Sequence, residues 1–284
     1  MKKKYLFAFL SMILLSFAVL SCSKGDDDGG EPGGGNGNPP AGDLKAGQVQ
    51  IKGYAHSSSK KITFYATAKK LTVDWGDGQK EEITPNGNGR EFSHEYENAT
   101  NFQTISINTE ELTTIRFGKN YGSYDGDIRE LRFGNCPKLQ GIELGSSYVP
   151  NLTVFEINRA ESLEQLRIYG TDLTELNLNG CINLKSLYCN TNSLTSLDVN
   201  KCTKLTWLNC SFNQLTSLDV SKCTNLTSLY CDSNQLSATA LNSLFTDLPV
   251  RTAADDAWIF YGSNPGSGSC NTSIAENKGW NVIW

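Results

Sequence analysis

The sequence has few of the residues, and none of the short motifs, that catalytic sites commonly use. It contains only two histidines, His56 and His94, and no G-x-S-x-G, H-E-x-x-H or phosphate-loop motif. The carboxylate pair of a glycosidase needs no motif, so this absence leaves that one class of enzyme open. We expect a non-enzymatic protein without a cofactor, and we interpret His94 as a packed side chain.

No C-x-x-C pair occurs among the nine cysteines, which argues against a zinc site. Six cysteines form two sets at a spacing of 21 residues: Cys181, Cys202 and Cys223, and Cys189, Cys210 and Cys231. The second set takes the place of an inward leucine, where cysteine behaves as a small hydrophobic residue. Parallel side chains in register rarely meet the torsion that a disulfide needs, so we expect buried free thiols.

Long apolar runs are also lacking beyond the N-terminus. Tyr5–Leu20 is apolar but too short and too interrupted by serines for a membrane span, and with Lys2–Lys4 before it is typical of a signal peptide. The following Val19-Leu-Ser-Cys22 resembles a bacterial lipobox. That resemblance implies removal of residues 1–21 and a lipid on Cys22 that anchors the protein in the bacterial outer membrane, exposed at the cell surface.

Residues 22–43 are rich in glycine, proline and asparagine, which predicts a flexible tether without a core. The acidic run Asp26–Asp28 resembles the surface-export signal of Bacteroidetes lipoproteins, and a solvated linker explains it equally well. Loss of Met1–Ser21 removes three lysines and no acidic residue, which takes the formal net charge from −5 to −8. This acidic balance argues against nucleic acid as a partner.

A repeat of 21 residues organises the second half of the chain. Its leading leucines are Leu173, Leu194, Leu215 and Leu236, and the core L-x-x-L-x-C-x-x-N-x-L occurs three times between residues 184 and 236. This pattern is the signature of leucine-rich repeats. One such turn cannot bury its leucines alone, so successive turns stack about 4.8 Å apart. We interpret the repeated asparagines as structural, with side chains bonded to the backbone of neighbouring turns.

Less regular copies precede these repeats, at residues 112–117, 128–133, 139–144, 152–157 and 163–168. Each turn then carries two short apolar segments about ten residues apart, which leaves no room for a long helix. We expect a flattened solenoid with two parallel sheets. An Asp-Gly-Asp in the 121–127 loop leaves two readings open, a calcium site and a solvated turn.

Alternating apolar and polar residues predict strands over 49–54, 62–67, 71–78, 92–96 and 102–107. The set Trp75-Gly-Asp-Gly78 followed by His94-x-Tyr96 resembles the PKD type of β-sandwich. The resemblance implies that Trp75 and Tyr96 pack between the sheets and that Asp77 caps its own turn. Asp74 and Asp77 supply only two carboxylates, which are few for a calcium site.

The predicted fold is mainly β: a PKD-like β-sandwich followed by a leucine-rich-repeat solenoid of 21-residue repeats with a small α/β C-terminal cap. The predicted parts are a lipoprotein signal peptide (1–21), a flexible tether (22–43), the sandwich (44–108), the solenoid (109–236) and the cap (237–284). In the cap we expect a helix capped by Ser237, a strand over 258–261, a short helix over 273–278 and a last strand over 280–284. The arrangement resembles internalin-like leucine-rich-repeat lipoproteins of Bacteroidetes, which implies adhesion to another protein.

The candidate binding face consists of outward positions on the L-x-x-L-x-C strands. It contains Arg167, Tyr169, Tyr188, Trp207, Asn209, Tyr230 and Asp232. Exposed Tyr and Trp are typical of protein-binding and sugar-binding faces, although tyrosine also favours strands without any ligand. The leading hypothesis is binding of an extracellular or host protein. The alternative is a surface glycan-binding protein of a polysaccharide-uptake system, which predicts rings set as a flat platform.

Overall fold

The computed structural model describes residues 44–55, 57, 60–84, 89–98, 100–117, 126–145, 151–157 and 159–284. Cys22 with the predicted signal peptide and tether, and most of the 121–127 loop, lie outside the described residues. Within the described ranges, no helix is long and apolar enough to cross a membrane. Residues 44–284 belong to one compact unit.

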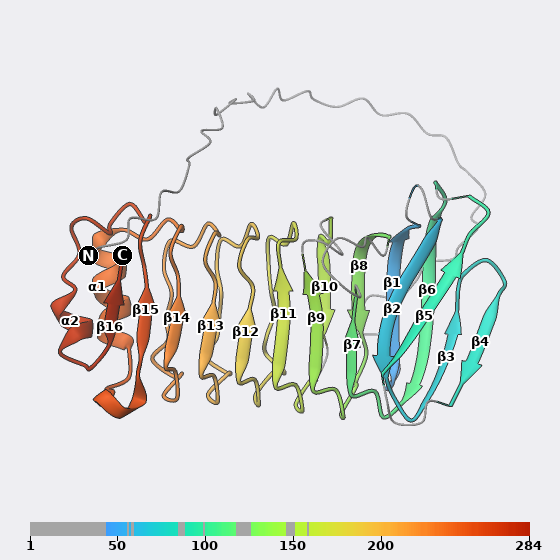
Figure 1. The fold of residues 1–284 in the computed structure, drawn as a ribbon, viewed down its shortest axis with the longest axis horizontal. Helices are drawn as coiled ribbons and strands as arrows, with labels where there is room; N and C mark the ends of the chain where they lie inside the picture. The colour runs from blue at the N-terminus through green and yellow to red at the C-terminus, as the bar shows by residue number, and fades with distance from the viewer. Residues whose placement is uncertain are drawn as a thin grey trace, which may run out of the picture. The chain divides into compact units, whose positions relative to one another are not determined.

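Two β-sheets build this unit (Figure 1). Sheet A has the order β10-β8-β1-β6-β3-β4, with β1 (Gln48–Tyr54), β3 (Lys70–Asp74), β4 (Lys80–Ile83), β6 (Phe102–Glu110), β8 (Asp127–Phe133) and β10 (Val154–Ile157). Sheet B has the order β16-β15-β14-β13-β12-β11-β9-β7-β2-β5. Its strands are β2 (Lys61–Thr67), β5 (Arg90–Glu95), β7 (Thr114–Arg116), β9 (Gly141–Gly145), β11 (Gln165–Tyr169), β12 (Ser186–Tyr188), β13 (Trp207–Asn209), β14 (Ser228–Tyr230), β15 (Trp258–Phe260) and β16 (Asn281–Ile283).

The N-terminal strands pack as a sandwich around aromatic side chains. Phe64 of β2 lies against Trp75 and Phe92, at ring-centroid distances of 5.9 and 5.1 Å. The Tyr96 hydroxyl donates to the Trp75 carbonyl at 2.9 Å, and Asp77 accepts from the backbone N–H of Gln79. The predicted packing of Trp75 and Tyr96 and the predicted cap by Asp77 are confirmed. The sequence reading missed β4, because its alternation is too short and too charged to stand out.

Both sheets continue from the sandwich into the repeats. On sheet A, β8 pairs antiparallel with β1 and parallel with β10; on sheet B, β7 pairs antiparallel with β2 and parallel with β9. Strand β6 runs through residue 108 to Glu110, so neither sheet breaks where the sandwich was expected to end. The sandwich therefore covers the first open end of the solenoid with hydrogen-bonded strands.

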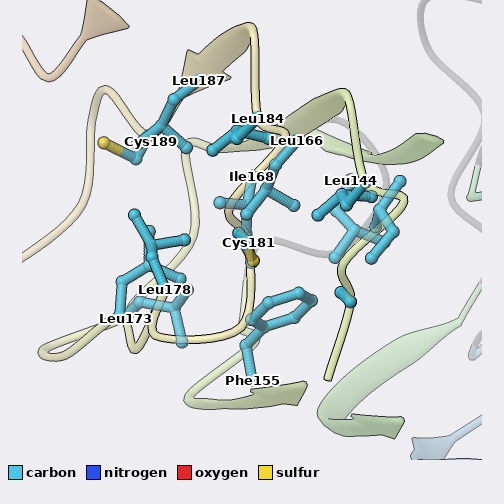
Figure 2. Close-up of a cluster of buried hydrophobic side chains, with 14 of the residues drawn as sticks. Leu144, Phe155, Leu166, Ile168, Leu173, Leu178, Cys181, Leu184, Leu187 and Cys189 are labelled. Atoms are coloured by element: carbon cyan, nitrogen blue, oxygen red, sulfur yellow. The ribbon is translucent and has the colours of Figure 1, made fainter. Parts of the chain in front are cut away.

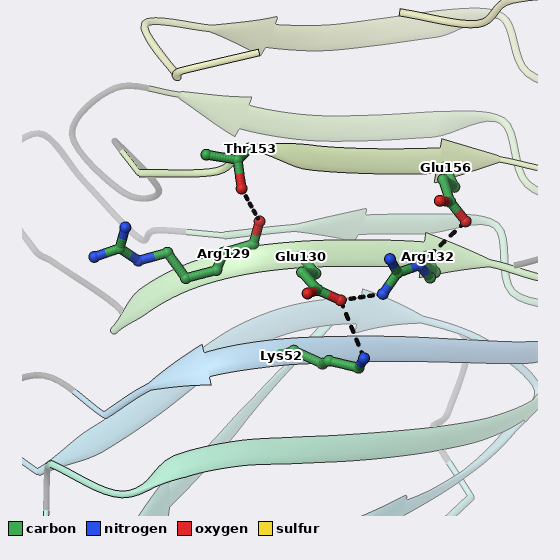
Figure 3. Close-up of polar contacts among 6 residues, drawn as sticks. All are labelled: Lys52, Arg129, Glu130, Arg132, Thr153 and Glu156. Carbon is green, nitrogen blue, oxygen red and sulfur yellow. Dashed lines mark hydrogen bonds and ion pairs between the residues drawn. The ribbon is translucent and has the colours of Figure 1, made fainter. Parts of the chain in front are cut away.

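A charged cluster lies on sheet A at this junction (Figure 3). Glu130 of β8 pairs with Lys52 of β1 at 3.1 Å and with Arg132, and Arg132 reaches Glu156 of β10 at 3.1 Å. Burial raises the pKa of Glu130, but its bonds to Arg132 and Lys52 outweigh burial and lower that pKa overall. The cluster thus joins the antiparallel and parallel parts of the sheet through three neighbouring strands.

The regular repeats place one strand each in sheet B, and their inward side chains form files. Leu187, Leu208, Leu229 and Ile259 are register partners on consecutive strands and are fully buried. Figure 2 shows the same packing where Leu166 and Ile168 meet Leu184 and Leu187 of the next rung. A continuous core results because every rung presents its leucines to the rung before and after it.

The expected second parallel sheet does not continue through the regular repeats. Among the described residues, β8 and β10 form its only parallel pair, and residues 173–183 and their equivalents hold turns instead. The reason is local: the side chains of Asn177, Asp198 and Asp219 each accept from the backbone N–H two residues later. These turns bend the backbone away from the geometry that a ladder needs.

A ladder of asparagines fixes each rung to the previous one. Asn213 donates to the Cys189 and Cys210 carbonyls at 3.0 and 3.1 Å, and its oxygen accepts from the Leu194 N–H at 3.0 Å. Asn192 and Asn234 make equivalent bonds. The structural role predicted for these asparagines is confirmed. Asn264 of the cap extends the ladder by bonding to Cys231, Tyr261 and Leu236, which the sequence reading had missed.

All cysteines among the described residues are free thiols, and seven of the eight are buried. Burial raises the pKa of Cys181, Cys202 and Cys223 to about 12. It raises the pKa values of Cys189 and Cys231 well above their ordinary range as well. The expectation of buried free thiols is confirmed.

The cap closes the other end of sheet B. Helix α1 (Ala238–Asp247) begins at Ser237, whose side chain accepts from the Ala240 N–H. The 3-10 turn η2 (Ala253–Asp255), β15, α2 (Ser273–Glu276) and β16 follow, with both strands parallel to the repeat strands. The predicted helices and strands of the cap are confirmed.

Candidate functional site

One file of outward side chains crosses sheet B from the sandwich to the cap. The register pairs its members strand by strand: Glu91, Tyr65, Arg116, Glu143, Arg167, Tyr188, Asn209, Tyr230, Phe260 and Ile283. We call this set the central file. Because parallel strands lie about 4.8 Å apart, neighbouring members touch. The candidate face is therefore longer than the repeats.

The C-terminal part of the central file is a stack of aromatic rings. Tyr230 and Phe260 lie face to face with centroids 4.4 Å apart and an interplanar angle of 5°. Trp207 comes from the neighbouring position of β13, and its ring lies 5.8 Å from Tyr188 and 5.1 Å from Tyr230. Trp207 thus bridges the gap that the small Asn209 leaves. The rings are half-buried because they cover one another's faces.

The N-terminal part of the file alternates in charge. The Arg167 guanidinium lies 4.8 Å from the Tyr188 ring centroid, and its Nη1 is 3.8 Å from Glu143. Arg116 lies 4.8 Å from the Tyr65 ring, whose hydroxyl donates to Glu91 at 2.6 Å. Cations over aromatic rings and beside carboxylates are attracted to both, so this part is already internally paired.

A pocket of about 460 Å³ opens beside the aromatic stack, at the carboxyl ends of the strands. Its walls include Asn209, Tyr230, Phe260, Phe212, Asp232 and Trp284. Phe212 and Trp284 are exposed to 58% and 77%, unusually high values for such large apolar side chains. Asp232 accepts from the Ser211 hydroxyl at 2.5 Å and is the one charged side chain among the residues that line the pocket.

Two local features place the exposed rings. Phe212 has φ of +55°, a left-handed conformation that bulky residues rarely adopt. Thr191 and Ser233, at the same place in adjacent rungs, share this conformation, because the backbone ladder imposes it on every rung. Gly262 makes room for Trp284: a Cβ there would lie 2.8 Å from Cδ1 of the indole.

The predicted site residues fall into two groups. Arg167, Tyr188, Asn209 and Tyr230 do meet in one file, with Trp207 beside them. Tyr169 and Asp232 occupy the same place in their rungs but lie three rungs apart, about 14 Å. Asp232 therefore belongs to the pocket, and Tyr169 does not line it.

Sequence reasoning missed several members of the site. Phe260 ends the segment Trp258-Ile-Phe, in which the one inward apolar residue lies between two outward residues, as in Ser228-Leu-Tyr230. This similarity of pattern could have identified Phe260 from the sequence. The role of Phe212 was also missed, since it falls in a turn. No local pattern joins Tyr65 to Arg116, because their pairing depends on how the sandwich docks.

Other candidate chemistry finds no support among the described residues. No three His, Cys, Asp or Glu side chains there are grouped as metal ligands. Asp74 pairs with Lys80 at 2.9 Å, and Asp77 bonds to His94 at 2.6 Å. Burial raises the pKa of Asp77, and the bonds from His94 and the Gln79 N–H outweigh burial and lower it. His94 also stacks on Trp75 at 5.0 Å, as expected for a packed side chain.

Comparison with known proteins gives three matches to report. The functional domain of InlJ from Listeria monocytogenes, described as including a cysteine ladder, is 23% identical over 51% of this chain and 35% of its own, with a TM-score of 0.41. The internalin InlF from Listeria monocytogenes strain 4b F2365 is 21% identical over 48% of each chain, with a TM-score of 0.34. This chain thus spans between a third and a half of the length of either structure. The comparison with curated proteins found no significant match. Residues 203–244 match the family described as leucine rich repeats in two copies, and this part of the solenoid accordingly consists of leucine-rich repeats.

Proposed function

We propose that the protein is a non-enzymatic surface lipoprotein whose outward face of sheet B binds another protein. The observation that carries this proposal is the continuous central file with its aromatic half. Solenoids commonly present such extended surfaces to protein partners. Clustered Tyr, Trp and Phe with an adjacent Arg are the residues that most often dominate protein–protein binding energy.

The ring geometry favours a protein over a glycan. A sugar ring needs the open face of an aromatic side chain, set as a platform. Tyr230 and Phe260 cover each other's faces, and Trp207 fills the space on the other side of Tyr230. What remains outward is a row of ring edges and hydroxyl groups, which suits the mixed polar and apolar surface of a protein partner.

The lipid anchor and outer-membrane location belong to this proposal through the lipobox at Val19–Cys22 and the tether behind it. The anchor would hold the unit at the cell surface, and residues 22–43 would give it reach. Mass spectrometry of the mature N-terminus tests this part: a lipid-modified cysteine at position 22 is expected, and an unmodified N-terminus elsewhere contradicts it.

Binding to an array of extracellular proteins tests the face. The neighbouring repeats indicate substitutions that the fold tolerates. Trp207→Ser introduces the residue found at the register partners Ser186 and Ser228, and Tyr230→Asn introduces the residue found at the register partner Asn209. Each is expected to weaken a specific hit at least about tenfold, the loss typical of an interface hot spot. Ile182→Thr removes an exposed apolar side chain elsewhere, with Thr203 and Thr224 as its equivalents, and should leave binding unchanged.

A hit that survives both face variants would place the binding surface elsewhere on the molecule. Retention on a polysaccharide gel that is lost with Trp207→Ser and Tyr230→Asn would instead establish the glycan alternative.

A further inference from the structure

The pocket beside the aromatic stack combines the Asp232 carboxylate with exposed rings, and none of the side chains that line it is basic. We propose that it is an anchor site for a basic side chain of the partner, and in particular for an arginine guanidinium. This inference rests on the proposed protein-binding function and adds to it the chemistry of one contact. Three observations support it.

The first observation is the unbalanced charge of Asp232. Among the described residues, its carboxylate accepts a hydrogen bond from the Ser211 hydroxyl and forms no ion pair with a lysine or an arginine. None of the residues that line the pocket is basic. A half-buried carboxylate of this kind is stabilised by a charged donor, and such pairs bind more strongly than neutral ones. The chain as a whole is acidic, with a formal net charge of −5, so a basic partner group is also favoured at long range.

The second observation is a filled copy of the same arrangement on the same sheet. Arg167 lies over the Tyr188 ring at 4.8 Å and 3.8 Å from the carboxylate of Glu143. At the pocket, the rings and the carboxylate are present and the guanidinium is missing. Arginine fits better than lysine, because its planar group can stack on a ring and pair with a carboxylate at once.

The third observation is that two large rings are exposed at the pocket. Phe212 keeps a bulky side chain at a left-handed φ where Ser233 and Ser263 hold small ones, and Gly262 leaves space for Trp284. Phe212 and Trp284 are also largely exposed, whereas the stacked Tyr230 and Phe260 are half-buried. A cation is attracted to an open ring face, which makes these two rings the ones that would hold it.

The test uses the full chain in an uncharged detergent and N-acetylarginine amide as the probe, observed by saturation-transfer NMR. N-acetylcitrulline amide is the matched neutral probe. The arginine probe is expected to bind saturably and the citrulline probe far more weakly. Asp232→Asn keeps an oxygen for Ser211 and should weaken arginine binding about tenfold, as expected when a charge-assisted bond is lost. Phe212→Ser should weaken it as well.

Asp198→Asn is the control variant. It makes the same charge change on the opposite side of the rung, where Asn177 already forms the equivalent turn, and it should bind the probe like the unchanged protein. Equal binding of the two probes, no saturable binding, or full binding by Asp232→Asn would each overturn the proposal. If the probe experiment fails in one of these ways but a protein on the array binds in a manner that depends on Trp207 and Tyr230, the proposed function remains supported. Probe binding without any array hit would support the pocket and count against the wider function.

Discussion

At the residue scale, single side chains make the hydrogen bonds that backbone groups make with one another in an ordinary sheet. The asparagine ladder satisfies turn carbonyls and N–H groups that face the core and have no strand partner there. The cysteines fill inward places that Leu144 and Ile168 occupy in earlier rungs, and their thiols stay protonated because burial opposes the thiolate. Both roles follow from the requirement that buried polar groups be paired or neutral.

Replacement of Asn213 by alanine is expected to lower the free energy of unfolding by about 3 kcal/mol. The change leaves the buried Leu194 N–H without a partner, which costs about 1–3 kcal/mol. It also removes one of the two asparagine bonds that the Cys189 and Cys210 carbonyls each accept, and each lost bond costs about 1 kcal/mol. Urea denaturation measures the difference. Gln214→Ala, at the exposed next position, is the control and should change stability by less than about 0.5 kcal/mol. Equal effects of the two variants would contradict the structural role of the ladder.

The buried thiols predict loss of stability in alkali. The folded pKa of Cys210 is raised to about 12, above its ordinary value of 9.0. The folded state therefore binds the proton more tightly than the unfolded state, and this contribution is complete below pH 9 and is lost as the pH rises from 9 towards 12. Denaturant midpoints at increasing pH should fall in this window. Cys210→Ala should show a smaller fall, and an identical fall would show that other groups cause it.

Phe212→Gly is expected to raise stability while it removes a ring of the pocket. Glycine adopts a φ of +55° without the strain of a Cβ, which is worth about 1 kcal/mol. Phe212→Ser should be nearly neutral, because Ser233 already adopts this conformation. Thermal unfolding of the three proteins would show the order, and a glycine variant less stable than the parent would refute the strain argument.

At the element scale, the two faces of each rung differ in backbone structure. One face forms a strand of sheet B, where the alternation of inward leucine and outward tyrosine has the period of two that a strand requires. The other face begins with the same apolar spacing but places Asp or Asn where its side chain captures the backbone. Apolar spacing alone therefore predicts burial correctly on both faces, but its prediction of a strand is correct on only one of them.

The stability of the junction between the sandwich and the repeats on sheet A should depend on the ion pairs of Glu130. Its folded pKa is lowered, so its contribution is present above its ordinary value of 4.5 and is lost as the pH falls through the folded value below that. Glu130→Gln leaves Arg132 and Lys52 without their shared partner and should cost about 2 kcal/mol at neutral pH. Acid denaturation from pH 7 to 3 should become less steep in this variant. Glu82→Gln, which removes an exposed pair with Lys70, is the control and should behave like the parent.

At the scale of the whole molecule, the sandwich and the first repeats share two sheets, the cap continues sheet B, and all three parts share one core. Most strands of the fold could be predicted, because leucines at a constant phase and alternating residues such as Val49–Tyr54 report burial directly. The continuity of the sheets could not, since nothing near Tyr65 or Arg116 indicates that β2 pairs with β7. For the same reason the sequence placed the binding face on the repeats alone, and the charged part of the central file beyond Arg167 was missed.

Shared sheets predict that the parts do not fold separately. Deletion of residues 44–108 would expose the edges of β7 and β8 and the buried ring of Phe117. The remaining chain is expected to aggregate or to lack a cooperative unfolding transition. Circular dichroism during thermal unfolding, with size-exclusion chromatography, tests this. A monomeric fragment of residues 109–284 that unfolds sharply would show instead that the solenoid is independent of the sandwich.

The equal spacing of the rungs also bears on how such a chain can change. Residues 194–199 and 215–220 both read Leu-Thr-Ser-Leu-Asp-Val, and each begins a rung with the same place in the core. An unequal exchange between the two gene segments would add or remove 21 residues at once, and the new rung would meet its neighbours with leucine, cysteine and asparagine in register. The surface can thus lengthen or shorten in whole steps, while its two closed ends stay the same.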